Sequence, residues 1–222
     1  MDCTVSSLIS AIKVALDQNN VSTQLFNTGD VDTLLLDELI ESKIADAARL
    51  VELAAPLHLL GKGVTFPNAS QVVTWDSEQG YGPGSVPLPE DFLRLVCFKM
   101  SDWDHPVHTP IYESDPLYAV QRSRFGGVRG NPQRPVCAIV NRNTGMVLEF
   151  YSCAQDSDAS ISMASYIPIP AKTTPEDGSA AYFTLPDKLQ PAIVYYAAYL
   201  VALITEPGKS ASLLAISNSL MQ

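Results

Sequence analysis

Apolar residues recur at helical spacing in the first 60 residues of the chain. A first helix is predicted from about Val5, with Asp2 or Thr4 placed to cap its first turn. A second helix is predicted to start at Asp32 or Thr33 and to end near Pro56. The apolar faces of the two predicted helices comprise Val5, Leu8, Ile9, Ile12 and Leu16, and then Leu36, Leu39, Ile40, Ile44, Ala47, Ala48 and Val51.

The opposite side of the second predicted helix is charged. We assign Asp37, Glu38, Glu41, Lys43 and Glu52 to this side. A solvated helix face is the simpler interpretation, because a surface helix turns its polar side to water. An acidic docking surface is the alternative interpretation.

The middle of the chain has the pattern of β-strands. Prolines hold residues 86–91 extended, and the mostly apolar run 92–98 predicts a strand with both faces largely covered. The short β-prone runs 64–66 and 71–75 predict a hairpin that leads into this strand. The runs 135–141 and 146–151 flank a glycine-containing turn and predict a second hairpin, and residues 161–168 predict a further strand of the same sheet.

Helical signals return near the end of the chain. A helix is predicted from Leu189 to Thr205, and because it is apolar on every side from Ala192 to Ile204, other helices, the sheet or a neighbouring subunit must cover it. A short amphipathic segment, 210–221, follows, with Leu213, Leu214, Ile216, Leu220 and Met221 as its apolar residues. The sequence therefore predicts one α+β domain, residues 1–222, with a helical bundle (1–60 and 186–222) and an inserted, mainly antiparallel β-sheet (61–185).

Charge is scarce and unevenly distributed. Of the 222 residues 17% are charged, and the formal net charge of −10 argues against a general nucleic-acid binder. No acid occurs between Asp115 and Glu149, and a helix is expected at 116–129 within this window. The window carries the candidate contacts to phosphate or to an acidic partner, which are Arg122, Arg124, Arg129, Arg134 and Arg142. In the alternative interpretation, these arginines pair with acids of the same chain or of another subunit.

Few residues carry a signal for catalysis, metal binding or a cofactor. Four widely spaced cysteines lack the spacing of a zinc or redox site, so buried thiols are expected. Prolines and Trp103 interrupt the turn that contains Asp102, Asp104, His105 and His108. We therefore predict no catalytic residue, no metal site and no cofactor. The alternatives are a small hydrolase or metal enzyme that uses the turn 102–108, and a β-rich module that binds sugar or peptide through Trp75, Tyr81 and Trp103.

The longest apolar run is shorter than the ~20 residues that a membrane-spanning helix needs. The start of the chain also lacks the charged and then apolar pattern of a signal peptide. These two features predict a soluble product made in a cytoplasm, with no membrane partner.

The order of these segments resembles a known family. Two N-terminal helices are followed by VPLPEDFLRLVCFK, by NPQRPVCAIVN leading into VLEFYS, and by LPDKLQPAIVYYAAYLVALITEP with a short terminal helix. This order is similar to that of the head-to-tail adaptor proteins (ring or head-completion proteins) of tailed bacteriophages, particularly short-tailed phages and the crAss-like group. The insert 75–84 and the loop 172–181 depart from the family pattern.

The resemblance implies a structural protein of the virion neck, assembled in the host cytoplasm. It implies a ring, expected to be a dodecamer, that joins the portal to the tail, with double-stranded DNA passing through its lumen without sequence specificity. Segment 210–221 would dock on the portal, the β region would face the next tail ring, and the arginines of 122–142 would contact an acidic neighbour. An acidic lumen would let DNA slide, since attraction to its phosphates would retard it.

Overall fold

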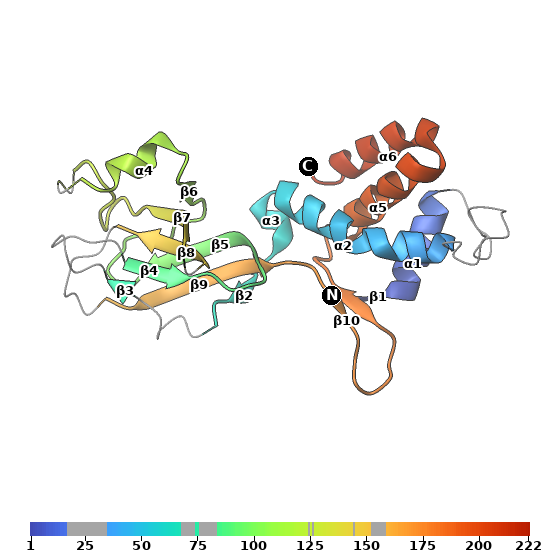
Figure 1. Ribbon diagram of the computed structural model, residues 1–222, viewed down its shortest axis with the longest axis horizontal. Coiled ribbons are helices and arrows are strands. Elements are labelled where there is room, and N and C mark those ends of the chain that lie inside the picture. Colours follow the sequence, from blue (N-terminus) through green and yellow to red (C-terminus); the bar gives the residue numbers. More distant parts are fainter. Residues whose placement is uncertain are drawn as a thin grey trace. The chain divides into compact units, whose positions relative to one another are not determined.

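The computed structural model describes residues 1–16, 35–67, 84–123, 125, 127–143, 145–151 and 159–222, together with the backbone of 74–75 (Figure 1). The chain forms two compact units. The helical unit contains Met1–Gly61 and Ile169–Gln222, and the sheet unit contains Lys62–Pro168. The predicted α+β class with largely antiparallel strands is confirmed.

The helical unit begins with a short strand that runs directly into the first helix. Its helices are α1 (Val5–Ala15), α2 (Leu36–Ala54), α3 (Leu57–Leu60), α5 (Gln190–Thr205) and α6 (Pro207–Ser219). Its strands are β1 (Asp2–Thr4), β10 (Lys172–Thr173) and β11 (Tyr182–Thr184).

Caps and apolar stripes account for the first helices. Thr4 caps α1, where its Oγ1 accepts a hydrogen bond from the backbone N–H of Ser7 at 3.3 Å. The predicted apolar stripe of α2 is buried along its whole length, which confirms the assignment of that face. Gly61, with φ of +80°, follows the last turn of α3 in a conformation that suits glycine. The predicted start at residues 32–33 lies outside the described residues.

Helix α5 packs against α1, α2 and α6. Its alanines let neighbouring backbones approach closely, and the buried residues are Ala192, Ile193, Val194, Ala197, Ala198, Val201 and Ala202. Leu213 and Ser217, one turn apart on α6, are buried against α5, and the Ser217 hydroxyl donates a 2.8 Å hydrogen bond to the Ala192 carbonyl. At the other end of α5, Leu203 and Ile204 are 46% and 54% exposed. The described residues of this chain therefore do not cover α5 on every side.

A small sheet holds residues 169–185 in the helical unit. Strand β11 pairs antiparallel with β10 on one side and with β1 on the other. The N-terminal amine of Met1 also donates to the carbonyl oxygen of Leu185 at 2.9 Å. The sequence analysis places residues 169–185 in the β-rich insertion, whereas the structure groups them with the helices because their strand partner is the N-terminal strand.

The described residues of the sheet unit form two sheets. The three-stranded sheet has the order β2 (Val64–Thr65), β9 (Ile161–Pro168), β5 (Phe92–Met100). The five-stranded sheet has the order β3 (Thr74–Trp75), β4 (Gly84–Pro87), β8 (Gly145–Phe150), β7 (Cys137–Arg142), β6 (Ile111–Tyr112). Neighbouring strands are antiparallel except β6 and β7, which are parallel. Helix α4 (Pro116–Val120) lies in the connection from β6 to β7.

Both sheets contribute to the core of this unit. Aromatic rings dominate it, with Phe98 and Phe150 fully buried and Trp103 packed edge-on against both. Strand alternation turns the opposite side of β7 and β8 toward a second, smaller cluster, because successive side chains point to opposite faces. That cluster contains Ala138, Val140, Val147 and Tyr151, with Tyr118 of α4 packed on it.

Several local predictions are confirmed. Strands β7 and β8 form the predicted hairpin, in which Arg142 pairs with Gly145 and Gly145 has φ of +115°. Strand β9 covers the predicted residues 161–168. Cys3, Cys97 and Cys137 are buried, as expected, whereas Cys153 lies outside the described residues.

Strand β5 covers the predicted run 92–98, and none of its side chains is exposed, as the prediction of two largely covered faces requires. Two local predictions are wrong. β2 pairs with β9 and β3 with β4, so runs 64–66 and 71–75 do not form a hairpin together. The expected helix at 116–129 ends at Val120, because Gln121 turns its side chain back to the backbone of this connection.

Candidate interaction surfaces

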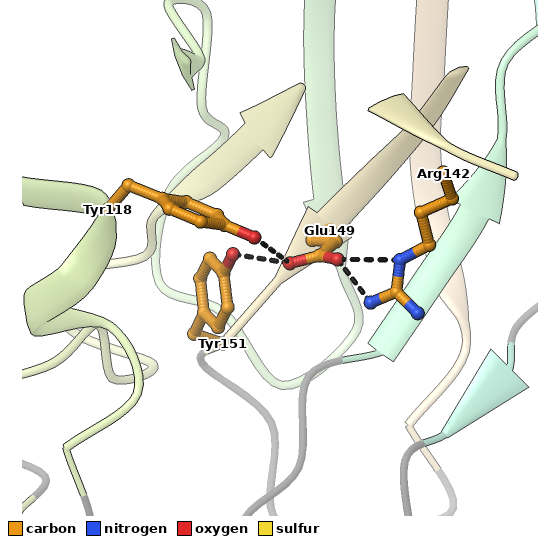
Figure 2. A network of polar contacts seen from close by, with 4 residues as sticks. All are labelled: Tyr118, Arg142, Glu149 and Tyr151. Carbon is orange, nitrogen blue, oxygen red and sulfur yellow. Dashed lines mark hydrogen bonds and ion pairs between the residues drawn. The ribbon is translucent and has the colours of Figure 1, made fainter. Parts of the chain in front are cut away.

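A polar cluster of the sheet unit surrounds Glu149 on β8. Alternation along this strand places Glu149 on the same face as Val147 and Tyr151, beneath α4. Its side chain is only 3% exposed. Figure 2 shows that its two carboxylate oxygens receive contacts from opposite directions, with two tyrosines on one side and Arg142 on the other.

Each carboxylate oxygen of Glu149 has its own donors. Oε2 accepts hydrogen bonds from the hydroxyl of Tyr151 at 2.6 Å and from that of Tyr118 at 3.4 Å. Oε1 accepts from Nε of Arg142 at 2.9 Å, and Nη2 of the same guanidinium also contacts it. A buried carboxylate is tolerated when it is paired and hydrogen-bonded in this way.

The network joins α4 to the β7–β8 hairpin. Burial, and then the hydrogen bond to Glu149, raises the pKa of Tyr151 above its ordinary value, so this hydroxyl remains a donor. Tyr118 supplies the link from α4. We conclude that Glu149 anchors the connection between β6 and β7 to the sheet beneath it.

The predicted arginines differ in their partners and in their exposure to solvent. Arg142 is held by Glu149 of its own chain, which is what the alternative interpretation expects. Arg122 lies with its guanidinium 5.6 Å from the centre of the Tyr118 ring, and a hydrogen bond with Tyr118 raises the pKa of Arg122. Arg134 is exposed, Arg129 is half-buried, and Arg124 lies outside the described residues.

The predicted portal-docking residues of segment 210–221 divide into two groups. Leu213 is buried inside its own unit, and Leu214 and Met221 are half-buried. Ile216, on α6, and Leu220, which caps the C-terminal end of α6, lie one turn apart and are 40% and 39% exposed. Only these two residues of the predicted set present substantial apolar surface.

A surface groove that the sequence analysis did not predict runs along α2 and α5. Its volume is about 500 Å³. The lining residues are Leu50, Leu53, Leu200, Leu203 and Ile204, with Lys43, Asp46 and Arg49 beside them. The sequence does carry a signal for this groove. The residues of α5 are apolar on every side, and such a helix needs more cover than the described part of this unit supplies.

The turn at residues 102–108 is organised by packing. Trp103 is buried in the aromatic core, which pins the turn to the sheet. His108 Nδ1 lies 2.7 Å from the carbonyl oxygen of Val96, and Lys99 donates to the backbone carbonyl of Asp104 at 3.3 Å. Among the residues that the structure describes, no group of three or more His, Cys, Asp and Glu side chains could hold a metal ion.

The alternative interpretation, a sugar- or peptide-binding module, requires three exposed aromatic residues, and one of them, Trp103, is buried. Trp103 is only 3% exposed and belongs to the core, so it cannot stack on a ligand. Tyr81 lies outside the described residues, and for Trp75 only the backbone is described.

Glu52 is the residue whose environment the sequence analysis placed wrongly. We expected it on the solvated side of α2, but it is 3% exposed. The helical repeat explains this, because Glu52 continues the i, i+4 line of Ile44 and Ala48 into the buried face. Burial raises its pKa to about 7, since desolvation disfavours the charged carboxylate.

Comparisons with known proteins agree with the adaptor resemblance. The model of the family described as SU10 adaptor protein matches residues 4–219, which is nearly the whole chain. No curated protein matches the chain. None of the helices in the described parts of the chain is long and apolar enough to cross a membrane.

Proposed function

The chain belongs to the SU10 adaptor protein family, and we propose that it forms the ring that joins the portal of a phage head to the tail. Family membership makes it a structural adaptor of the phage particle that interacts with other head or tail proteins. We propose the ring, its dodecameric stoichiometry and its position under the portal. We also propose the assignment to short-tailed or crAss-like phages.

The observation that carries the proposal is the distribution of exposed apolar side chains. Both units present large hydrophobic residues that no other described part of the chain covers. On the helical unit these include Leu50, Leu53, Leu203 and Ile204 of the groove, Ile216 of α6, and Leu220 at the C-terminal end of α6. Apolar surface on separate elements supports a subunit with several protein neighbours.

Helix α6 is the proposed portal contact. Leu213 and Ser217 fasten α6 to α5, so Ile216 and Leu220 are presented on a supported helix face. Residues at i and i+4 form one apolar strip, the pattern with which a helix enters a hydrophobic groove. The sheet unit would then face the next tail protein.

The helical unit is the proposed wall of the DNA channel, with α1, α2, α5 and α6 as its bundle. Residues 1–61 and 169–222 contain 13 acids and six bases. A wall with this negative excess repels phosphate, so DNA passes without being held.

The first test is the native mass of the protein, alone and mixed with its candidate portal protein. A ring, or a monomer that assembles only on portal, supports the proposal. The double variant Ile216→Ser/Leu220→Ser should lose portal binding while keeping its fold. Val14→Ser is the matched control, because Val14 is 64% exposed on α1. A monomer or dimer that is indifferent to portal would refute the proposed function.

A further inference from the structure

The chain crosses between the helical unit and the sheet unit twice, once after Gly61 and once after Pro168. The first crossing is residues 61–63, Gly-Lys-Gly, which join the end of α3 to the start of β2 and are all exposed. The second crossing is residues 168–171, which join β9 to β10 and contain two prolines. Glycine and proline have opposite effects on backbone freedom, so the two crossings differ in stiffness.

Gly61 has the conformational freedom that a pivot needs. Its φ of +80° and ψ of −157° lie in a region that is essentially restricted to glycine. An added Cβ at this position would meet no atom of the described residues within 4 Å. Because glycine populates positive and negative φ about equally, rotation of the backbone at Gly61 costs little.

Gly63 marks the residue at which the sheet unit fixes the chain. Its φ is +66°, and an added Cβ would overlap the carbonyl oxygen of Tyr166 on β9. The next residue, Val64, pairs with Tyr166 in the antiparallel ladder of β2 and β9. On the other side, α3 ends at Leu60. Rotation in the first crossing is therefore confined to Gly61 and its neighbour in the chain.

Prolines stiffen the second crossing. Pro168 and Pro170 each fix their own φ, and each disfavours the helical region for the residue before it. Pro168 still pairs with Phe92 of β5, so this crossing begins on the sheet. Beyond its other end, Lys172 of β10 forms an ion pair with Glu41 of α2 at 2.5 Å. A proline-containing segment that is anchored at both ends is a semi-rigid spacer.

We propose that the two crossings form a hinge, with Gly61 as its pivot and residues 168–171 as its stiff arm. Hinges are a few loop or element-terminal residues that absorb changes in φ and ψ while the packed units keep their structure. Gly61 directly follows a helix and meets this description. The second covalent connection limits the rotations that the first crossing alone would allow.

The hinge goes beyond the proposed ring and does not depend on it. A structural adaptor binds neighbours through more than one surface. Rotation at Gly61 would let each unit keep its own neighbour while the angle between those neighbours changes.

The test measures distances between spin labels in the full chain by double electron–electron resonance. Nitroxide-labelled unnatural amino acids stand at Val14 of the helical unit and Met163 of the sheet unit, which are 64% and 50% exposed. Labels at Val14 and at Ser212, an exposed residue of α6 in the same unit, give the reference distribution. Excess unlabelled protein ensures that only distances within one chain are measured.

We expect the distance distribution between the units to be at least about twice as wide as the reference distribution. Gly61→Ala should shift and narrow it, because alanine avoids positive φ. Gly178→Ala is the matched control and should leave it unchanged. Gly178 also has positive φ, +76°, and open space around it, but it lies inside the helical unit.

A second variant, Pro170→Gly, tests the stiff arm and should widen the distribution, because glycine removes the restriction on φ. Circular dichroism confirms that each variant is folded. Equal widths for the two label pairs in the wild type would overturn the inference and leave the proposed function standing. A folded Gly61→Ala variant with the wild-type distribution would also overturn it. If Gly61→Ala does not fold, Pro170→Gly decides, and an unchanged distribution in that variant contradicts the hinge.

Discussion

Glu52→Gln tests the physical description of the helical unit most directly. Glu52 is buried to 3% exposure on α2, and its pKa is raised by burial from 4.5 to about 7. Between these two values the folded protein keeps the proton while the unfolded chain releases it. Stability therefore falls as the pH rises through this window, because the folded state must pay desolvation energy to ionise the buried carboxyl.

The size of the effect follows from the shift. A pKa that rises from 4.5 to about 7, at about 1.4 kcal/mol for each pH unit, gives about 3.5 kcal/mol lost above neutral pH. Because partial relaxation and the other interactions of Glu52 reduce this figure, we expect about 1–3 kcal/mol. Glutamine has the same shape without the charge, so the variant should gain this amount at about pH 8 and almost nothing below about pH 4.5.

The assay is urea unfolding followed by circular dichroism over this pH range. Asp46→Asn is the control, because it removes an exposed carboxylate from the same helix and should change stability by less than about 0.5 kcal/mol. The reasoning would be refuted if the free energies of unfolding of Glu52→Gln and the wild type differed by the same amount at every pH. A variant that is less stable than the wild type at about pH 8 would also refute it.

Two further predictions concern the sheet unit. Gly84→Ala should destabilise the sheet unit by about 1–3 kcal/mol in thermal unfolding, because the added Cβ would overlap the ring of Phe150. Gly208→Ala is the control and should be close to neutral, because its Cβ meets open space. Glu149→Gln should lower the free energy of unfolding in urea by about 1–3 kcal/mol, because it removes the ionic partner of Arg142 and leaves a weaker acceptor. An unchanged unfolding midpoint would contradict the anchoring role of Glu149.

The candidate surfaces could be predicted only where local sequence carries the signal. The acid-free window identified Arg122 and Arg142, but not that Arg142 would be bound by Glu149, because strand register decides which side chains meet. Segment 210–221 was identified by its apolar residues, yet Leu213 is used within the chain and Ile216 is left outside. Which residue of an amphipathic segment faces a partner depends on what already covers the other side.

The sequence by itself determined the elements whose causes are local. Thr4 caps α1, a 3.6-residue repeat buries one face of α2, and the glycine-containing turn closes the β7–β8 hairpin. Each depends on residues a few positions apart, so periodicity and turn chemistry suffice.

Tertiary structure alone decided the long-range pairings and their consequences. It paired the N-terminal strand with β11, drew Glu52 and Trp103 into the interior, and left the α2–α5 groove open. Burial depends on elements that are distant in the chain, and the same apolar residue serves equally well as core or as contact surface. Only the packed structure shows which apolar residues remain for partners.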